Sequence, residues 1–366
     1  MLTKNTTRRQ KLIKYIIPSV ANTLKLERHC PHCNRFGGNI HSGIRYRCIN
    51  DTKITAIAQR RIKCPFCKTT WTIRPDGIRD GQQRSSRLIS LGILLYMLGL
   101  SCPTGEKFLR CLDCRSSKSS IERDVAEAGK NAKTLHCNAP RMRVRVLGVD
   151  GTGARMAGRN AGLLFFVDID RGKLISVEPV NERDTNRVRK HVCAVMSATG
   201  AEQLRTDELH VYEGIVPEGF HTICLAHWRK SKARRANEIC RQLKAEGMQF
   251  ESEDMVRLLR LLKLEPRQPT LPEDVEKLVR RYINCHKGTL WKANQLLQHI
   301  ERTREQVGSG DGDRTNNTTE RLIGLDYKIM VRSMRGIKAE SKALGHCYLS
   351  EYLRGENGVC DLRKVV

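Results

Sequence analysis

The sequence lacks an apolar run long enough to cross a membrane, and its first residues lack the apolar core and cleavage site of a secretory signal. The most apolar stretch, residues 88–100, is shorter than the roughly 20 residues of a membrane-spanning helix and fits a buried helix instead. We therefore expect a cytoplasmic protein with no membrane partner.

Acidic residues are scarce relative to basic ones. The chain has 39 Asp and Glu residues against 66 Lys and Arg residues, so its net charge is +27. An excess of this size points to a polyanionic partner, and nucleic acid is the commonest such partner of a soluble chain. Charge alone does not separate a DNA-binding protein from a basic RNA-binding or ribosomal protein.

The chain has 15 cysteines but lacks the small secreted context in which cysteines form a disulfide framework. Four of them form two Cys-x2-Cys pairs, Cys30-Pro-His-Cys33 and Cys64-Pro-Phe-Cys67. Such pairs make tight knuckles that each supply two thiolates to a tetrahedral ion, so they predict a zinc ribbon at residues 29–75. We expect Zn²⁺ in a structural role, because four thiolates leave no open position for a substrate.

A helical region follows the predicted ribbon, at residues 82–138. Residues 88–100 predict an apolar helix, which residues 103–111 follow. After a short polar break at residues 115–118, residues 119–128 predict another helix, with Ser119 or Ser120 as its N-cap. Two helices across a short polar break resemble a helix-turn-helix, whose second helix enters the major groove of DNA. A small helical bundle has the same pattern, so the position beside a zinc ribbon is what favours DNA binding.

The stretch around Asp150 organises the second half of the chain. Valines, with Gly148 and Gly151 on either side of the acid, predict a strand that ends in a turn at Asp150. The elements predicted next are two hairpin strands, a polar helix and a fourth strand, at residues 163–168, 174–178, 181–198 and 203–209. The order is β-β-β-α-β, and the fourth strand carries a second acid, Asp207. Mg²⁺ prefers carboxylate oxygens, so the pair predicts a site for Mg²⁺ or Mn²⁺ of the kind that cleaves phosphodiesters.

A third acid, Glu320, lies in the first turn of a predicted helix that Asn316 or Asn317 can cap. At about 100° per residue, apolar side chains fall on one side of Glu320 and basic side chains on the other. The glutamate is therefore expected at the seam between a face that docks on the core and a face that tracks phosphates. The basic residues predicted to contact DNA are Arg321, Lys328, Arg332 and Arg335.

Other acids close in sequence compete for the same role. Asp170 is explained by its Arg-Gly turn, and Asp168 lies beside the same hairpin. Glu208 should point to the opposite face of the sheet from Asp207, because side chains alternate along a strand. These positions argue against a metal-binding role for Asp168, Asp170 and Glu208.

Asp150, Asp207 and Glu320, with Asn317 three positions before the glutamate, resemble the DDE triad of bacterial insertion-sequence transposases. The resemblance implies an RNase H-like core that uses Mg²⁺ or Mn²⁺. It also implies that the three acids are catalytic and bind the metal, with hydrolysis at transposon ends followed by strand transfer from a 3′-hydroxyl. The expected partner is double-stranded DNA, as terminal inverted repeats and as target.

Two further features carry this resemblance. Cys224-Leu-Ala-His227 is similar to the C-x2-H element that Mutator-like and related DDE transposases have after the second acid. The four-cysteine ribbon followed by a helix-turn-helix resembles the DNA-binding half of such enzymes. Joining two DNA ends implies a homo-oligomer on DNA, and a location on the nucleoid within the cytoplasm.

The predicted fold class is a multidomain α/β protein: an RNase H-like mixed-sheet core with an all-α insertion, preceded by the ribbon and the helix-turn-helix. Trp228 and Trp291 fall in the insertion, where core packing is favoured over stacking on bases. The expected divisions are a basic arm (1–28), the ribbon (29–75), the helix-turn-helix (82–138), the core (141–227 and 309–352), the insertion (228–308) and a tail (353–366).

Two other classes of function fit part of the pattern. A catalytically inactive, transposase-derived DNA-binding protein would keep the ribbon and the helix-turn-helix but would not need all three acids. An RNase H-type nuclease or junction resolvase is disfavoured, because such enzymes rarely carry two DNA-binding domains, here the ribbon and the helix-turn-helix, before the catalytic core.

Overall fold

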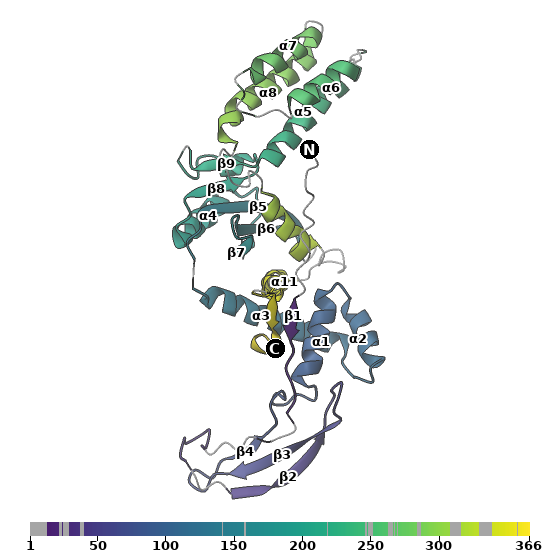
Figure 1. Cartoon of the computed structure of the whole chain (residues 1–366), viewed down its shortest axis with the longest axis vertical. Coiled ribbons are helices and arrows are strands. Elements are labelled where there is room, and N and C mark those ends of the chain that lie inside the picture. The colour runs from purple at the N-terminus through teal and green to yellow at the C-terminus, as the bar shows by residue number, and fades with distance from the viewer. Residues whose placement is uncertain are drawn as a thin grey trace, which may run out of the picture. The chain divides into compact units, whose positions relative to one another are not determined.

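The chain forms two compact units, Met1–Ala139 with Asp326–Val366, and Pro140–Leu325. Figure 1 shows the elements of each in a computed structural model of the chain. The structure describes residues 13–21, 24, 29–36, 40–140, 142–156, 159–217, 219–245, 247, 252–262, 266, 268, 270–283, 287–307, 316–328, 339–356 and 358–366.

A three-stranded antiparallel sheet lies near the start of the first unit, in the order β2-β3-β4 (Figure 1). Its strands are β2 (Ile40–Cys48), β3 (Ala56–Lys63) and β4 (Thr70–Ile73). The two Cys-x2-Cys pairs precede β2 and β4, so the sheet occupies the stretch in which the sequence predicts a zinc ribbon.

Three helices follow the sheet: α1 (Ser86–Met97), α2 (Cys102–Arg110) and α3 (Lys118–Asn138). The side chain of a serine caps each N-terminus, and these serines are Ser85, Ser101 and Ser117. The predicted caps of the last helix, Ser119 and Ser120, are therefore wrong: the N-cap is Ser117, two residues before Ser119, and its side chain accepts the backbone N–H of Ser120.

The first unit also includes chain from both ends of the sequence. In the expected basic arm, β1 (Lys14–Ile16) pairs in parallel with β10 (Val359–Asp361) in the expected tail. The expected arm therefore contains a short strand, whose partner lies far along the chain. A one-turn helix, η4 (Leu362–Lys364), follows β10.

Helix α11 (Glu340–Leu353) packs on α3 inside the first unit. The two helices approach so closely that a Cβ atom on Gly129 would lie 2.8 Å from the backbone of Gly345. The expected core boundary at residue 352 differs from this division, since α11 makes its contacts with α3.

The second unit is built on a mixed five-stranded sheet in the order β7-β6-β5-β8-β9. The strands are β5 (Val146–Met156), β6 (Arg159–Asp168), β7 (Lys173–Glu178), β8 (Gln203–Thr206) and β9 (His221–Ile223). The pairs β5–β6 and β6–β7 are antiparallel, whereas β5–β8 and β8–β9 are parallel. The predicted mixed sheet and its β-β-β-α-β start are therefore present, with α4 (Thr185–Thr199) as the helix.

Asp150 lies inside β5 and not at its end, so this part of the prediction is wrong. The hairpin with β6 continues to Met156, well beyond the turn that Gly151 suggested. The parallel partner β8 pairs with β5 only as far as Gly148, and Asp207 follows the last residue of β8. Both acids therefore lie just past the end of the β5–β8 ladder.

The two faces of this sheet have different neighbours. Leu147 and Val149 belong to a buried cluster with Val188 and Val192 of α4. Gly148 points the other way, because side chains alternate along a strand, and there it meets α9 (Asn317–Ile323). A π-helical segment, η3 (Gly324–Lys328), continues α9.

A short helix, η1 (His210–Tyr212), precedes β9. The described elements between β9 and α9 are all helices, namely α5 (Leu225–Ala245), α6 (Ser252–Leu261), α7 (Leu271–Ile283), α8 (Lys287–Thr303) and η2 (Arg304–Gln306). A separate apolar cluster holds α5 to α8 together, with Trp228 fully buried in it. Trp291 is 59% exposed, so core packing is the right prediction for Trp228 and the wrong one for Trp291.

Within the described part of the chain, no helix combines the length and the apolar character needed to cross a membrane.

Candidate metal centres

Four cysteine sulfurs meet at the base of the three-stranded sheet. The Sγ atoms of Cys30 and Cys67 lie 3.6 Å apart, and those of Cys33 and Cys64 lie 3.7 Å apart. All four sulfurs lie within 4.8 Å of one another, as the spacing of the two pairs predicts. A group of four thiols at these separations could hold a tetrahedral Zn²⁺.

Each Cys-x2-Cys pair sits in the same tight turn. Asn34 donates its N–H to the carbonyl of Cys30 at 2.8 Å, and Lys68 donates to Cys64 at 3.0 Å. Asn34 and Lys68 both have positive φ angles, 54° and 61°, which reverse the chain after the second cysteine. The repeated turn aims two sulfurs at one point from each side, and hydrogen bonds to Thr69 lower the pKa of Cys67 to about 6.

Three carboxylates converge in the second unit. Oxygen atoms of Asp150, Glu182 and Asp207 lie within 4.8 Å of one another. They come from the middle of β5, the loop after β7 and the residue after β8. Three hard oxygen donors at this spacing could hold one or two divalent ions of the Mg²⁺ class.

Glu182 is absent from the sequence prediction, although it belongs to this group. It is held by Tyr212, whose hydroxyl donates to Glu182 Oε1 at 2.6 Å, and Tyr212 is fully buried. It also lies over Gly151, where a Cβ atom would overlap the Glu182 side chain. The glycine at position 151 thus leaves room for the Glu182 side chain, but nothing in the sequence identified Glu182 as the residue that occupies this space.

Burial and mutual repulsion change the proton affinity of these acids. Burial, followed by the charges of Glu182 and Asp207, raises the pKa of Asp150 to about 7. Burial also raises the pKa of Asp207 to about 6, against a backbone hydrogen bond from Leu209 that lowers it. A bound cation would remove this repulsion, so the metal-free cluster is electrostatically unfavourable when fully ionised.

Glu320 makes a different contact from the one predicted. Its Oε1 atom lies 2.6 Å from Nε2 of His227, on α5. The pKa of His227 is raised to about 9, first by its hydrogen bond with Cys224 and then by nearby negative charges. Glu320 is 44% exposed at its side chain and is outside the group that Asp150 forms.

Asn316 ties the Glu320 helix to the sheet and to Cys224. Its side-chain amide donates to the carbonyl of Val149 at 3.1 Å, and its backbone N–H points to Cys224 Sγ at 3.0 Å. Asn316 is the N-cap residue by position but makes no side-chain capping bond, because its amide serves the sheet instead. The C-x2-H element thus positions α9: Cys224 holds the start of the helix, and His227 holds Glu320.

The competing acids are engaged elsewhere. Asp168 pairs with Arg171 at 2.5 Å, and Asp170 pairs with Arg145 at 2.7 Å. Asp168 is buried at the end of β6, whereas Asp170 is exposed in the β6–β7 turn, as the sequence indicates for Asp170.

Glu208, next to Asp207, faces the helical segment. Its carboxylate lies 2.6 Å from Lys232 Nζ on α5 and 3.2 Å from His299 Nε2 on α8. Lys232 is fully buried, and its ammonium stacks on Trp228 at 4.8 Å from the ring centroid. This network fixes the chain after β8 to the helices and keeps Glu208 out of the acid group, but not by strand alternation, because Asp207 and Glu208 both follow the last residue of β8.

The predicted DNA-contacting residues are only partly within the described chain. Arg321 on α9 and Lys328 at the end of η3 are both exposed. Arg332 and Arg335 lie outside the described residues.

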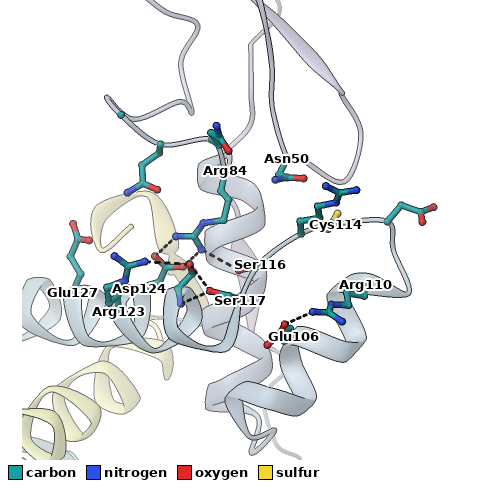
Figure 2. Close-up of a pocket in the computed structure, with 16 residues that line it drawn as sticks. Asn50, Arg84, Glu106, Arg110, Cys114, Ser116, Ser117, Arg123, Asp124 and Glu127 are labelled. Atoms are coloured by element: carbon teal, nitrogen blue, oxygen red, sulfur yellow. Dashed lines mark hydrogen bonds and ion pairs between the residues drawn. The ribbon is translucent and has the colours of Figure 1, made fainter.

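A polar cavity of about 1160 Å³ lies beside α2 and α3 in the first unit. Figure 2 shows Arg84 reaching across it to Asp124 and Ser116, and the pair of Glu106 with Arg110. Its lining holds four arginines and four acids: Arg84, Arg110, Arg115, Arg123, Glu106, Asp113, Asp124 and Glu127. Several of these charges are paired with one another, as Arg84 is with Asp124 and Arg110 with Glu106.

No family model matches this chain, and no curated protein matches it.

Proposed function

We propose that this protein is a DDE-type transposase that binds the ends of its mobile element and catalyses cleavage and strand transfer of DNA. The observation that carries the proposal is the convergence of Asp150, Glu182 and Asp207 from three separate elements. The mixed sheet with its β-β-β-α-β start supports an RNase H-like core, and the helix that carries Glu320 supports the third position of the triad.

The donor set suits hard divalent cations. Asp150, Glu182 and Asp207 offer only carboxylate oxygens, and burial together with the neighbouring carboxylates raises the pKa of Asp150 and of Asp207, so a bound cation would stabilise the ionised cluster. Mg²⁺ or Mn²⁺, when bound, would supply two positive centres that stabilise the attacking and the leaving oxygen of a phosphodiester. The four cysteines would hold Zn²⁺ for structure alone.

The residues of the chain then have separate tasks. Asp150 and Asp207 would share the ions, Tyr212 would keep Glu182 turned toward them, and Glu320 would complete the site from α9. Arg321 and Lys328 would neutralise phosphates of the bound DNA, with Arg332 and Arg335 further along the chain. The predicted partners are double-stranded DNA and further copies of the chain that bring two ends together.

The rival is a catalytically inactive DNA-binding protein derived from such an enzyme. The contact between Glu320 and His227 favours it to some degree, because that carboxylate is engaged outside the acid cluster. The two proposals share the DNA-binding half and differ only in what the acids do.

Cleavage and strand transfer on DNA that carries the element's own ends decide between them. With Mg²⁺ present, Asp207→Asn should lower the rate by about 10³-fold, since a lost ligand removes several kcal/mol of transition-state stabilisation. Asp170→Asn is the matched control, because that acid pairs with Arg145 on the surface and should leave the rate unchanged. DNA binding without any cleavage by the unaltered protein would favour the inactive rival.

A further inference from the structure

The three-stranded sheet of the ribbon has two unlike faces. Paired residues of neighbouring strands point to the same side, and successive residues alternate. Arg45 and Arg47 of β2 therefore share a face with Arg61 and Lys63 of β3, which we call the basic face. The opposite face holds apolar side chains, namely Ile44, Tyr46, Ile62, Trp71 and Ile73, together with Arg60.

The charges of the basic face are not offset within the sheet. None of the residues in β2, β3 or β4 is acidic. Arg45, Arg61 and Lys63 are exposed and Arg47 is half-buried. In the part of the chain that the structure describes, Arg45, Arg47 and Lys63 form no ion pair with a carboxylate.

The four charges lie in a line. Along the strand direction their order is Arg47, Arg45, Arg61 and Lys63. Arg47 pairs with Ile57 and Arg45 with Gln59, and Arg61 and Lys63 follow two and four residues after Gln59 on β3. At about 3.4 Å per residue, the line has a charge every 7 Å or so and is about 20 Å long. A row of this length matches a polyanion with regularly spaced charges and is far longer than a single phosphate group.

The composition of the basic face selects among polyanions. Proteins that bind single strands without sequence preference stack bases on aromatic side chains beside a basic groove. The aromatic residues of this sheet, Tyr46 and Trp71, lie on the opposite face. A basic face without aromatic side chains is suited to the sugar-phosphate backbone of a duplex. Contacts to this backbone position a protein on DNA but do not read its sequence.

We propose that the basic face of the ribbon sheet, Arg45, Arg47, Arg61 and Lys63, docks along the phosphate backbone of double-stranded DNA. This inference rests on the proposed function for its partner and adds a second, sequence-independent contact to the helix-turn-helix. It assigns the ribbon's part in DNA binding to one face of its sheet and to the phosphate backbone.

The test is the salt dependence of DNA binding by the full chain. The triple variant Arg45→Gln, Arg47→Gln and Lys63→Gln is compared with the unaltered protein and with a charge-conserving control, Arg45→Lys, Arg47→Lys and Lys63→Arg. Fluorescence anisotropy would measure affinity for the element's end and for a random duplex from 50 to 200 mM salt, with zinc content checked for each protein.

Each phosphate contact makes the affinity fall about 3.5-fold further between the lowest and the highest salt concentration. Without three such contacts, the total fall in affinity over this range should be about 40-fold smaller. Both duplexes should be affected equally, and the control should behave like the unaltered protein. An unchanged salt slope in the glutamine variant, or an equal loss in the control, overturns the proposal.

Three further outcomes separate this inference from the proposed function. The same titrations are made with a single-stranded DNA and an RNA probe, and a change confined to these probes would assign the face to another nucleic acid and overturn the assignment to duplex DNA. Absence of DNA binding by the unaltered protein at every salt concentration would remove the proposed function as well. Steep binding by all three proteins alike would remove only the role of this face.

Discussion

The sulfur cluster and the carboxylate cluster are equally compact, yet the chain builds them in opposite ways. Each of the two Cys-x2-Cys pairs is one local turn, repeated with the same hydrogen bond at Asn34 and Lys68. Asp150, Glu182 and Asp207 are brought together by strand pairing, a buried tyrosine and a glycine contact. The first cluster depends on its own residues, and the second depends on packing of the whole unit. We expect remote substitutions to disturb only the second.

The largest expected effect is loss of the sulfur cluster. Cys64→Ser should abolish zinc binding, whose apparent free energy in small zinc domains is about 10–16 kcal/mol, and should unfold the ribbon. Metal analysis should show one equivalent of zinc less, and proteolysis should cut within residues 29–75. Cys48→Ser is the matched control, because this cysteine is exposed and outside the cluster. Retention of zinc by Cys64→Ser would contradict the assignment.

A remote substitution in the second unit should come next. Lys232→Met leaves the carboxylate of Glu208 buried without its ammonium partner, which typically costs about 3–5 kcal/mol. Urea denaturation should show the loss, and binding of Mg²⁺ should weaken because Glu208 adjoins Asp207. Arg280→Met is the control: its pair with Glu276 is exposed, so the expected change is below about 1 kcal/mol. Equal midpoints for the two variants would argue against the buried network.

The carboxylate cluster should also respond to pH and Mg²⁺ together. The folded pKa values of Asp150 and Asp207, about 7 and about 6, exceed the unfolded value of about 3.9. The contribution of these two acids to the stability of the metal-free protein is therefore fully present when both are protonated and is lost as the pH rises from about 4 to about 7.

Mg²⁺ binds the ionised carboxylates, so its stabilising effect should grow over the same pH range. At a concentration 100 times the dissociation constant it should stabilise the fold by about 2.7 kcal/mol, raising Tm by about 5 °C or more at pH 8. At pH 5 the rise should nearly vanish. Calorimetry of the unaltered protein and of Glu182→Gln measures both, and an equal rise at the two pH values would count against the cluster.

The smallest expected effect comes from a single methyl group. A Cβ atom at Gly148 would lie 2.5 Å from Thr319 Oγ1 and 2.8 Å from Asn316 Oδ1, so Gly148→Ala should push α9 off β5. Overpacking of this kind costs about 1–3 kcal/mol. Gly153→Ala in the same strand is the control, since nothing lies within 4 Å of its added Cβ atom. Zinc content should be the same in both variants, because a substitution beside the carboxylate cluster should leave the sulfur cluster unchanged.

The same contrast explains how far the sequence could predict this molecule. The cysteine knuckles, the mixed sheet and the helical segment before α9 follow from local patterns of spacing and apolarity. Glu182 could not be found in this way, because its partner Tyr212 is 30 residues away and no periodicity links them. The strand at Lys14–Ile16 has a partner more than 300 residues along the chain, so no local signal marks it.

The third acid shows the same limit. A helix near Glu320 was predictable from its cap and its apolar pattern, and α9 is there. The contact of Glu320 with His227, and the use of Asn316 to bond Val149, depend on how α5 and β5 lie beside that helix. Sequence spacing identified the residues of the C-x2-H element but not the bonds that they make.

The central claim is that Asp207 binds the catalytic metal ion, and a change of metal preference tests it most directly. Asp207→Cys replaces a hard carboxylate with a softer thiolate, which favours softer metals than Mg²⁺. The account predicts that cleavage of the element's ends by this variant is lost in Mg²⁺ and restored at least in part by Mn²⁺, while Asp207→Asn stays inactive in both. Equal loss of activity in the two metals for both variants, with DNA binding intact, would contradict it.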